Sequence, residues 1–245
     1  MKWRMFICAI CFLIGGCSLN IPLEDQFSDP DAITDVLSAR SLLASAYKAM
    51  PQQIFQLSVL SDDFCPSQHL NKDMSLQGLY NWREVEMTEL AGTVWAGDYA
   101  VIAEVNALLA RIDAVVTLDE TEKLEKMRIV CEAKALKSWC YFDLLRLFAP
   151  RYEGNENKDG IILKKRVELD FLPRSSVKEC VTEIRTLLNE ARNVDNTQKN
   201  VYWLSDKAVA YLQVELELYA GNYPAVLELT KDLETEYPES VLGAD

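Results

Sequence analysis

One candidate for ligand binding is a short run of aromatic and polar side chains, Tyr80-Asn81-Trp82-Arg83. Flat aromatic rings stack on the C–H faces of sugars, and carboxylate, amide and guanidinium groups pair with hydroxyls. The same stretch of chain also holds two adjacent aspartates and the single histidine, His69. The mixture makes Asp62, Asp63, Tyr80, Asn81, Trp82 and Arg83 candidates for contact with a ligand. Packing or plain surface exposure of these side chains is the alternative.

The second candidate for chemistry is the thiol of Cys17. A basic start and an apolar stretch, Phe6 to Ile14, precede it. That stretch is too short for a membrane span, which needs about 20 residues, and it has the length of a signal-peptide core. The residues Ile14-Gly15-Gly16-Cys17 resemble a bacterial lipobox, in which the cysteine is acylated and becomes the first residue. We predict a signal peptide over 1–16 and lipid on Cys17; an ordinary cleaved signal is the alternative.

Composition excludes several classes of function. The chain has 25 basic and 38 acidic side chains and a formal net charge of −13, and no basic patch is visible for binding nucleic acid. Cys8 and Cys11 leave with the predicted signal peptide, and the rest of the chain has a single histidine and no C-x-x-C pair, which argues against metal and redox sites, so we expect no cofactor. Catalysis would need a carboxylate pair or a nucleophile with its base. Solvated acidic faces explain the acidic pairs, so we predict that the chain is not an enzyme.

Long helices must position these residues, because the 245-residue chain has only 9 glycines and 8 prolines to interrupt it. Apolar residues at helical spacing predict helices between Asp31 and Pro51, over 95–113, over 120–148, over 177–191, and on both sides of a Gly221-Asn222 turn. No stretch alternates with period two for long enough to demand a strand. The prediction is an all-α fold.

Some details can be assigned within this frame. Asp31 is expected to cap the first helix, and Ser176 with Glu179 forms a capping box for the helix over 177–191. Residues 51–90 lack a clean period and are predicted to form a long, mostly loop segment. Such loops are uncommon without a function, which favours a binding site there.

Other conspicuous side chains are expected to be structural. Trp95 and Tyr99 share a helical stripe with apolar residues and are predicted to lie in the core. Asn106, in mid-helix, is predicted to be a buried hydrogen bonder. Packing between helices is expected for Trp139, Tyr141 and Phe142, and Trp203 is expected to be a loop or packing aromatic.

The last helix pair resembles a tetratricopeptide repeat, because small residues such as Ala208 and Ala210 precede its tight turn. Several segments then match one family in order. They are "CSLNIPLEDQFSDPDAI", "LLASAYKAM", "LSDD", "VWAGDYAVIAEVNALLARI", "EAKALKSWCYFDLLRLFAP", "LPRSSVKECVTEIRTLLNEA" and "SDKAVAYLQVELELYAGNYPAVLEL". Together they resemble the SusD/RagB family of Bacteroidetes outer-membrane nutrient-uptake lipoproteins.

The resemblance implies an irregular tetratricopeptide-like helical fold and a non-catalytic subunit that binds a glycan or another nutrient. It also implies a partner, a TonB-dependent transporter of the SusC type, and a lipid anchor in the outer membrane, at the cell surface or on the periplasmic face. Family members usually run longer. We therefore expect a signal peptide over 1–16, a lipidated leader over 17–30 and one SusD-like domain over 31–245 that is truncated at its C-terminal side.

Two alternatives belong to other classes. A tetratricopeptide-type periplasmic scaffold lipoprotein for outer-membrane assembly has a similar length, but it should show regular repeats from near the N-terminus. A non-binding fragment of a split family member is the other alternative.

Overall fold

The computed structural model describes residues 33–61, 63–64, 74–167, 171–192 and 202–236. The chain divides into two compact units, Met1–Ala32 and Ile33–Asp245. The first unit lies outside the described residues, and with it Cys17 and the expected cap Asp31. The second unit is called the body.

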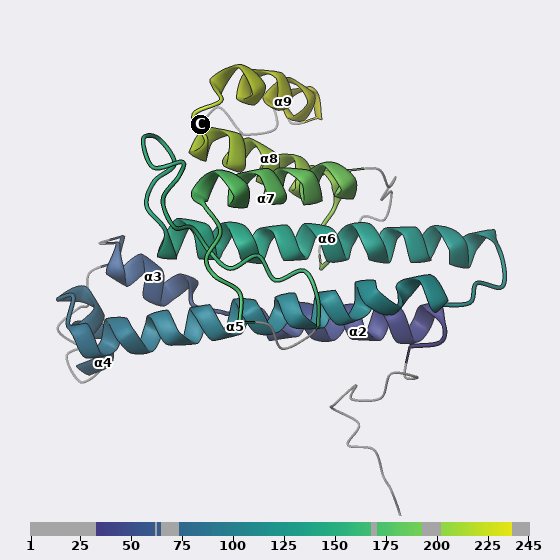
Figure 1. Cartoon of the computed structure of the whole chain (residues 1–245), viewed down its shortest axis with the longest axis horizontal. Helices are drawn as coiled ribbons and strands as arrows, with labels where there is room; N and C mark the ends of the chain where they lie inside the picture. The colour runs from purple at the N-terminus through teal and green to yellow at the C-terminus, as the bar shows by residue number, and fades with distance from the viewer. Residues whose placement is uncertain (1–32, 62, 65–73, 168–170, 193–201, 237–245) are drawn as a thin grey trace, which may run out of the picture. The chain divides into compact units, whose positions relative to one another are not determined.

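The body is built from helices (Figure 1). Their bounds are α2 Val36–Ala49, α3 Ile54–Leu60, α4 Met74–Tyr80, α5 Glu84–Arg111, η3 Ile112–Ala114, α6 Glu120–Phe148, α7 Val177–Ala191, α8 Asp206–Tyr219 and α9 Tyr223–Glu236. Extended pairing in the described part of the chain is limited to two isolated bridges, Asp35 with Val116 and Asp159 with Ser176. The predicted all-α fold is confirmed.

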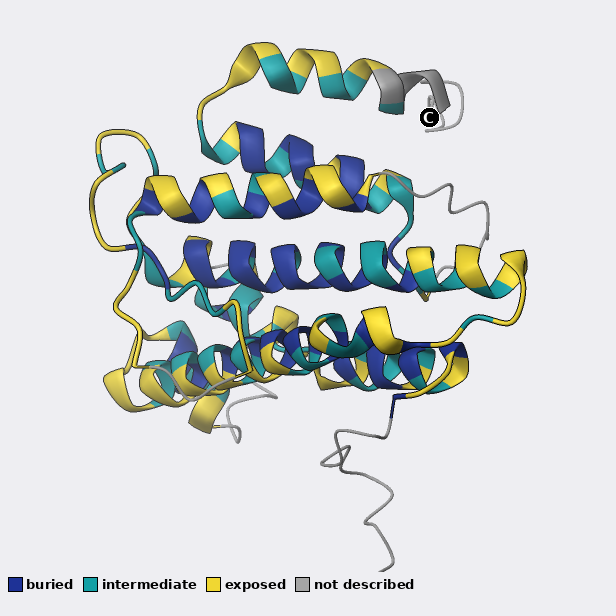
Figure 2. Ribbon diagram, turned by 45° about the vertical axis from the view of Figure 1, so that its right-hand side comes forward, coloured by how far each residue is buried: buried dark blue, intermediate teal, exposed yellow. Residues whose placement is uncertain are grey.

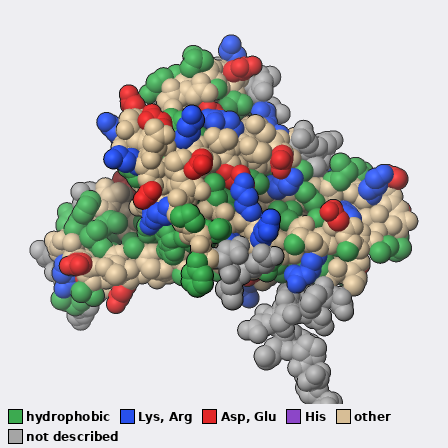
Figure 3. Space-filling view, in the orientation of Figure 1, with side chains coloured by type: hydrophobic (Ala, Val, Ile, Leu, Met, Phe, Trp, Pro, Cys, Tyr) green, Lys and Arg blue, Asp and Glu red, His purple; other side chains and the backbone are tan. Residues whose placement is uncertain are grey.

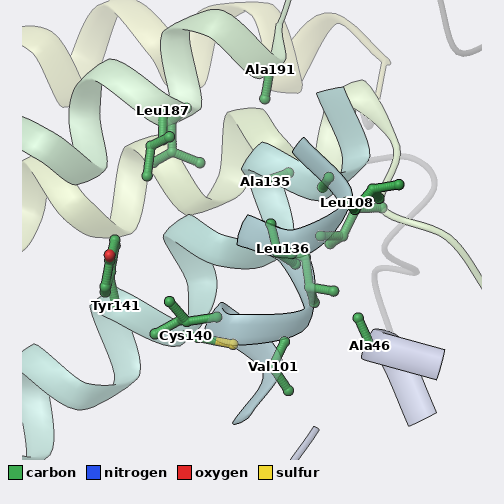
Figure 4. Packing of buried hydrophobic residues seen from close by; sticks show 14 of the residues in the cluster. Ala46, Val101, Leu108, Ala135, Leu136, Cys140, Tyr141, Leu187 and Ala191 are labelled. Atoms are coloured by element: carbon green, nitrogen blue, oxygen red, sulfur yellow. The ribbon is translucent and has the colours of Figure 1, made fainter. Parts of the chain in front are cut away.

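The long helix α6 lies at the centre of the packing. It packs on α5 and α2 on one side and on α7 and α8 on the other, and α9 packs on α8 (Figure 1). The dark faces in Figure 2 show that these helices turn their buried sides toward one another. Figure 4 shows the same core closely, with Val101 and Leu108 of α5, Leu136 and Tyr141 of α6, and Leu187 of α7. Burial of such side chains contributes about 1.5–3 kcal/mol each.

Side chains at the helix starts explain where two of the helices begin. The Ser176 hydroxyl accepts a bond from the Glu179 amide at 3.2 Å, and the Ser176 amide donates to the Glu179 carboxylate at 2.8 Å. This is the predicted capping box of α7. Helix α2 begins after Asp35, whose carboxylate accepts from the Ser38 amide at 2.7 Å. A cap at the very start of the helix satisfies its free amides, so Asp35 takes the role expected of Asp31.

The chain between α6 and α7 is held down by buried polar side chains. The Tyr99 hydroxyl both accepts from the Ile162 amide and donates to the Ile162 carbonyl, each at 2.9 Å. The Lys164 carbonyl accepts from the Asn106 amide group at 2.9 Å and from the Tyr141 hydroxyl at 2.6 Å. Asn106 is therefore the buried hydrogen bonder that the sequence predicts.

The expected long loop over 51–90 is wrong for its described part. This stretch holds α3, α4 and the first two turns of α5, and 65–73 lie outside the described residues. Val59, Leu79, Leu90 and Val94 form a second, small core among these helices. Helices α3 and α4 have seven residues each, about two turns, which is too short for a clear periodic pattern.

Helix α5 also starts earlier than its expected beginning at residue 95. Its first turns carry Glu84, Glu86 and Glu89, and only Leu90 and Val94 are buried before the main core begins. These turns pack on the small core alone, so their apolar stripe is too sparse to be recognised from sequence.

Candidate functional site

The structure brings together four of the predicted binding residues at one corner of the body. Tyr80 ends α4, Asn81 and Trp82 form the turn, and Arg83 precedes the first residue of α5. Asp63 is described elsewhere, after α3, where its carboxylate accepts from the Ser61 hydroxyl at 3.0 Å. Asp62 and His69 lie outside the described residues.

Trp82 has an unusual backbone at this corner. Its φ is +55°, the left-handed region, and among the described non-glycine residues it alone has a positive φ. The Trp82 amide donates to the Leu79 carbonyl at 3.0 Å, and the Arg83 amide donates to the Gly78 carbonyl at 2.8 Å. This pair of bonds is a Schellman motif, whose left-handed position is normally glycine. An indole there costs roughly 1–2 kcal/mol in backbone energy relative to a right-handed conformation.

Burial of the Trp82 ring does not offset this backbone free energy, because the residue is 61% exposed. Bulky residues in strained conformations persist where the surrounding structure imposes them, and they concentrate at functional sites. The corner thus presents a flat aromatic surface to solvent on a backbone fixed by hydrogen bonds. A flat ring held in this way is suited to stacking on a planar or apolar face of a ligand.

The neighbours of Trp82 are engaged in building the corner. The Arg83 guanidinium donates to the Met74 carbonyl at 2.6 Å and forms an ion pair with Glu86. The Asn81 amide group donates to the Gln77 carbonyl at 2.8 Å. Tyr80 is half-buried and packs on the small core. These contacts give Tyr80, Asn81 and Arg83 structural roles, and contact with a ligand stays a prediction for each of them.

Gly78 explains why α4 and α5 approach so closely at this corner. A Cβ on Gly78 would lie 2.3 Å from the Glu86 carboxyl carbon, so a side chain at position 78 would require Glu86 to move. Glu86 is the ion-pair partner of Arg83, so any larger residue at position 78 would displace the pair. The small size of Gly78 and the ion pair between Arg83 and Glu86 together hold the corner, and with it Trp82, in place.

The sequence analysis missed a pair of phenylalanines next to the predicted Asp63. Phe55 of α3 and Phe64 are both about half exposed, and their ring centroids lie 5.8 Å apart. The sequence carried no signal for this pair, because Phe55 lies four residues before the buried Val59, a spacing that predicts a shared helix face. Exposed aromatic pairs are candidates for ligand contact.

The buried ionisable groups lie between helices, in the main core. Asp98 of α5 is 2% exposed, and burial, with Asp143 second, raises its pKa to about 7. Lys137 of α6 donates to the Asn106 side chain at 2.6 Å, and burial lowers its pKa to about 8. Within the described ranges no three His, Cys, Asp or Glu side chains are grouped to hold a metal ion, and no helix has the length and hydrophobicity to cross a membrane.

Comparison with protein families gives a match over most of the chain. The model of the SusD-like family, described as starch-binding and associating with the outer membrane, matches residues 23–215. The chain belongs to the SusD-like family. This confirms the predicted membership.

Solved structures support the same fold at low sequence identity. A SusD superfamily protein from Bacteroides vulgatus is 19% identical with a TM-score of 0.68, over 85% of this chain and 48% of that one. A SusD-like carbohydrate-binding protein from Bacteroides vulgatus is 15% identical, TM-score 0.65, over 83% and 45% of the two chains. A laminarin-binding SusD-like protein is 19% identical, TM-score 0.61, over 82% and 44%. Comparison with curated proteins gave no match.

The SusD-like chain thus spans a little less than half the length of the solved proteins it matches. The family match over 23–215 includes α2 to α7 and the α4–α5 corner. Likeness at identities of this size establishes the fold.

Proposed function

We propose that this SusD-like chain is a non-catalytic glycan-binding lipoprotein that serves a TonB-dependent transporter of the SusC type at the outer membrane. The family description, starch-binding and outer-membrane-associated, supports the ligand class and the location. A structural neighbour that binds laminarin supports a polysaccharide ligand as well. In this role the chain holds a glycan for transport and performs no bond cleavage.

The exposed, strained Trp82 is the observation that carries the proposed binding. Sugars present patches of C–H groups that stack on indole rings, while their hydroxyls need polar partners nearby. Trp82 supplies the ring, and Asn81 and Arg83 flank it with amide and guanidinium groups. The ring stands on a fixed turn, so little ordering is required when a sugar binds.

Attachment to the membrane is proposed through lipid on Cys17, with 1–16 removed as a signal peptide and 17–30 as the leader to the body. Each buried CH₂ of an acyl chain contributes about 0.8 kcal/mol, so more than one chain on the residue gives a durable anchor. Removing Cys17 tests this part separately: the Cys17→Ala variant should lose the label when cells are grown with labelled palmitate. Continued labelling of that variant would place the lipid elsewhere.

Binding is tested with the chain from residue 17 onward and two soluble polysaccharides, amylopectin and laminarin, by affinity electrophoresis and calorimetry. We expect one of them to retard the protein and Trp82→Ala to weaken binding by about tenfold or more, which is about 1.4 kcal/mol. Phe171→Ala is the matched control, because Phe171 is a fully exposed aromatic in another loop.

The two other readings of the chain are outcomes of the same experiment. Binding that is unchanged in Trp82→Ala would remove the α4–α5 corner from the site. A folded protein that binds neither polysaccharide and does not copurify with a large barrel from its own cells would favour a scaffold or a non-binding fragment.

A further inference from the structure

Large aliphatic side chains are exposed at one end of the body, away from the α4–α5 corner. They belong to the start of α2, the connection between η3 and α6, and the first turns of α6. Leu118 is 84% exposed and Leu37 is 76% exposed. We call this set the end patch, and its members are Leu37, Val116, Leu118, Leu124 and Met127.

Backbone contacts place these side chains at the same end of the body. The Val116 amide donates to the Thr34 carbonyl at 3.2 Å, next to an isolated bridge between Val116 and Asp35, which holds Val116 beside the start of α2. The Leu118 amide donates to the Glu122 carboxylate at 2.7 Å, at the start of α6. Figure 1 shows the start of α2 and the start of α6 together on the right, and Figure 3 shows hydrophobic side chains there.

The end patch is a fixed surface. The Lys126 ammonium donates to the carbonyls of Asp113 and Val115, at 3.3 and 3.0 Å, and ties the connection to α6. The Asp119 carboxylate caps α6 by accepting from the Glu122 amide at 2.8 Å. Exposed aliphatic groups on a backbone fixed in this way keep their positions without a partner, so the surface is ready to bind one.

We propose that the end patch rests in a zwitterionic lipid surface and so orients the anchored body on the membrane. This inference rests on the proposed lipid at Cys17. Ile33, the first described residue of the body, precedes α2 directly, so the leader joins the body at the end that carries the patch. The 16 residues from Cys17 to Ile33 span at most about 55 Å when extended, and about 22 Å as a flexible chain.

A tether of this length holds the end patch close to the membrane, where its effective concentration is high. The end patch lies next to the point where the tether joins the body, so it faces the membrane. The opposite end of the body, with the α4–α5 corner, then points away from the lipid. The corner that presents Trp82 would remain open to a large glycan.

The composition of the end patch favours lipid over a protein partner. All its members are aliphatic, whereas the energetic centres of protein interfaces are enriched in Trp, Tyr and Arg. The charged residues around the end patch indicate which headgroup charge it tolerates. Glu120 and Glu122 stand in the first turn of α6, against one exposed lysine, Lys123. Acidic residues at this end disfavour anionic headgroups, so the surface is zwitterionic.

The test separates the patch from the natural anchor. The chain from residue 17 onward, with an N-terminal hexahistidine tag, is held on phosphatidylcholine vesicles that contain a nickel-chelating lipid. Leu118→Trp places a reporter in the end patch, and phosphatidylcholine brominated in its acyl chains quenches indoles that reach the hydrocarbon. We expect stronger quenching than in the unsubstituted chain, which keeps its own tryptophans.

Leu227→Trp on α9 is the matched control, since Leu227 is an exposed leucine at 67% outside the patch. It should show no added quenching, and Leu37→Glu introduced into the Leu118→Trp chain should reduce the reporter's quenching at least twofold. No added quenching of Leu118→Trp, or equal quenching of Leu227→Trp, overturns the proposal. Because the tag replaces the natural lipid, a failure here is distinct from a failure of Cys17 acylation, which palmitate labelling measures.

Discussion

At the scale of single residues, Trp82 combines a backbone cost with an exposed ring. Replacing it by glycine should raise the free energy of unfolding by about 1 kcal/mol, because glycine adopts the left-handed conformation without the Cβ clash. The same Trp82→Gly change should weaken glycan binding by about tenfold or more, because the ring is gone. Urea denaturation of the apo protein measures the first effect and calorimetry the second.

Trp82→Ala is the control that separates the two effects. Alanine keeps a Cβ at the positive φ, so its stability should stay close to that of the unsubstituted chain while binding weakens by about tenfold or more. A Trp82→Gly protein that is less stable than the original would show that the ring contributes packing, and would contradict the interpretation of the corner as strained for function.

Sequence reasoning at this scale succeeded where a residue type has one common role. Ser176 and Glu179 at their spacing predicted a cap, and Asn106 in an apolar helix predicted a buried hydrogen bond. The left-handed backbone conformation of Trp82 was not predictable, because glycine normally occupies this position of the Schellman motif. The roles of Asn81 and Arg83 in building the corner depend on Gln77 and Met74 carbonyls that come close only after folding.

At the scale of helices, the contact between α5 and α6 contains a buried acid. Asp98 has an oxygen without a hydrogen-bond partner, and its pKa is raised to about 7 by burial first and by Asp143 second. A pKa raised in the folded state means that folding favours the protonated form. The contribution of Asp98 to stability is therefore fully present below the unfolded pKa of about 4 and is lost as the pH rises to about 7.

Asp98→Asn should remove that loss, because asparagine keeps the shape without the charge. The difference in unfolding free energy between the variant and the original should be small near pH 4 and should grow to at most about 4 kcal/mol above pH 7. Denaturation across the pH range measures it. A difference that does not depend on pH would show that Asp98 is equally ionised in both states.

The contact between α2 and α6 depends on one arginine. The Arg40 guanidinium donates to Glu132 at 2.6 Å and to Glu125 at 2.9 Å, and it lies over the ring of Trp203 at 5.1 Å. Glu132 is buried. Arg40→Met should lower the free energy of unfolding by about 3 kcal/mol, because it leaves a buried carboxylate without its partner.

A double-mutant cycle checks the cause of that loss. Glu132→Leu added to Arg40→Met should recover most of the stability, since the stranded charge is then gone. If the two losses simply add, the arginine stabilises the body through its packing on Trp203 and not through the ion pair.

The prediction of helices from sequence followed their length. Helices α6 and α7 were predicted at their observed positions, because each carries an apolar stripe over several turns. Helices α3 and α4 were missed because two turns bury too few side chains to show a period. Missing α4 also affected the expected surroundings of the candidate site. Trp82 stands on a corner between two helices and not in the long loop that was expected.

At the scale of the whole molecule, the sequence was sufficient for the all-α class and for family membership, because both depend on the order of amphipathic segments. It could not provide the α4–α5 corner, which depends on Gly78 lying under Glu86. Nor could it provide the end patch, because exposure at the start of α2 and of α6 follows from how these helices meet.

The stacking of helices away from α6 predicts uneven stability across the body. The described side chains of α9 include none that is buried, and α9 packs mainly on α8, as the absence of dark colour on it shows in Figure 2. Helix α6, in contrast, has packed neighbours on both sides.

Local opening is easiest where few apolar contacts are lost. Amide hydrogen exchange of the apo protein should therefore be fastest in α9 and slowest in α6, by a factor of at least about one hundred, which corresponds to a difference of about 3 kcal/mol in opening free energy. The end of α5 and the middle of α7 serve as internal references, since both contribute to the main core. Equal protection of α9 and α6 would mean that α9 opens only when the entire body unfolds, and that the helices behave as a single cooperative unit in spite of their unequal burial.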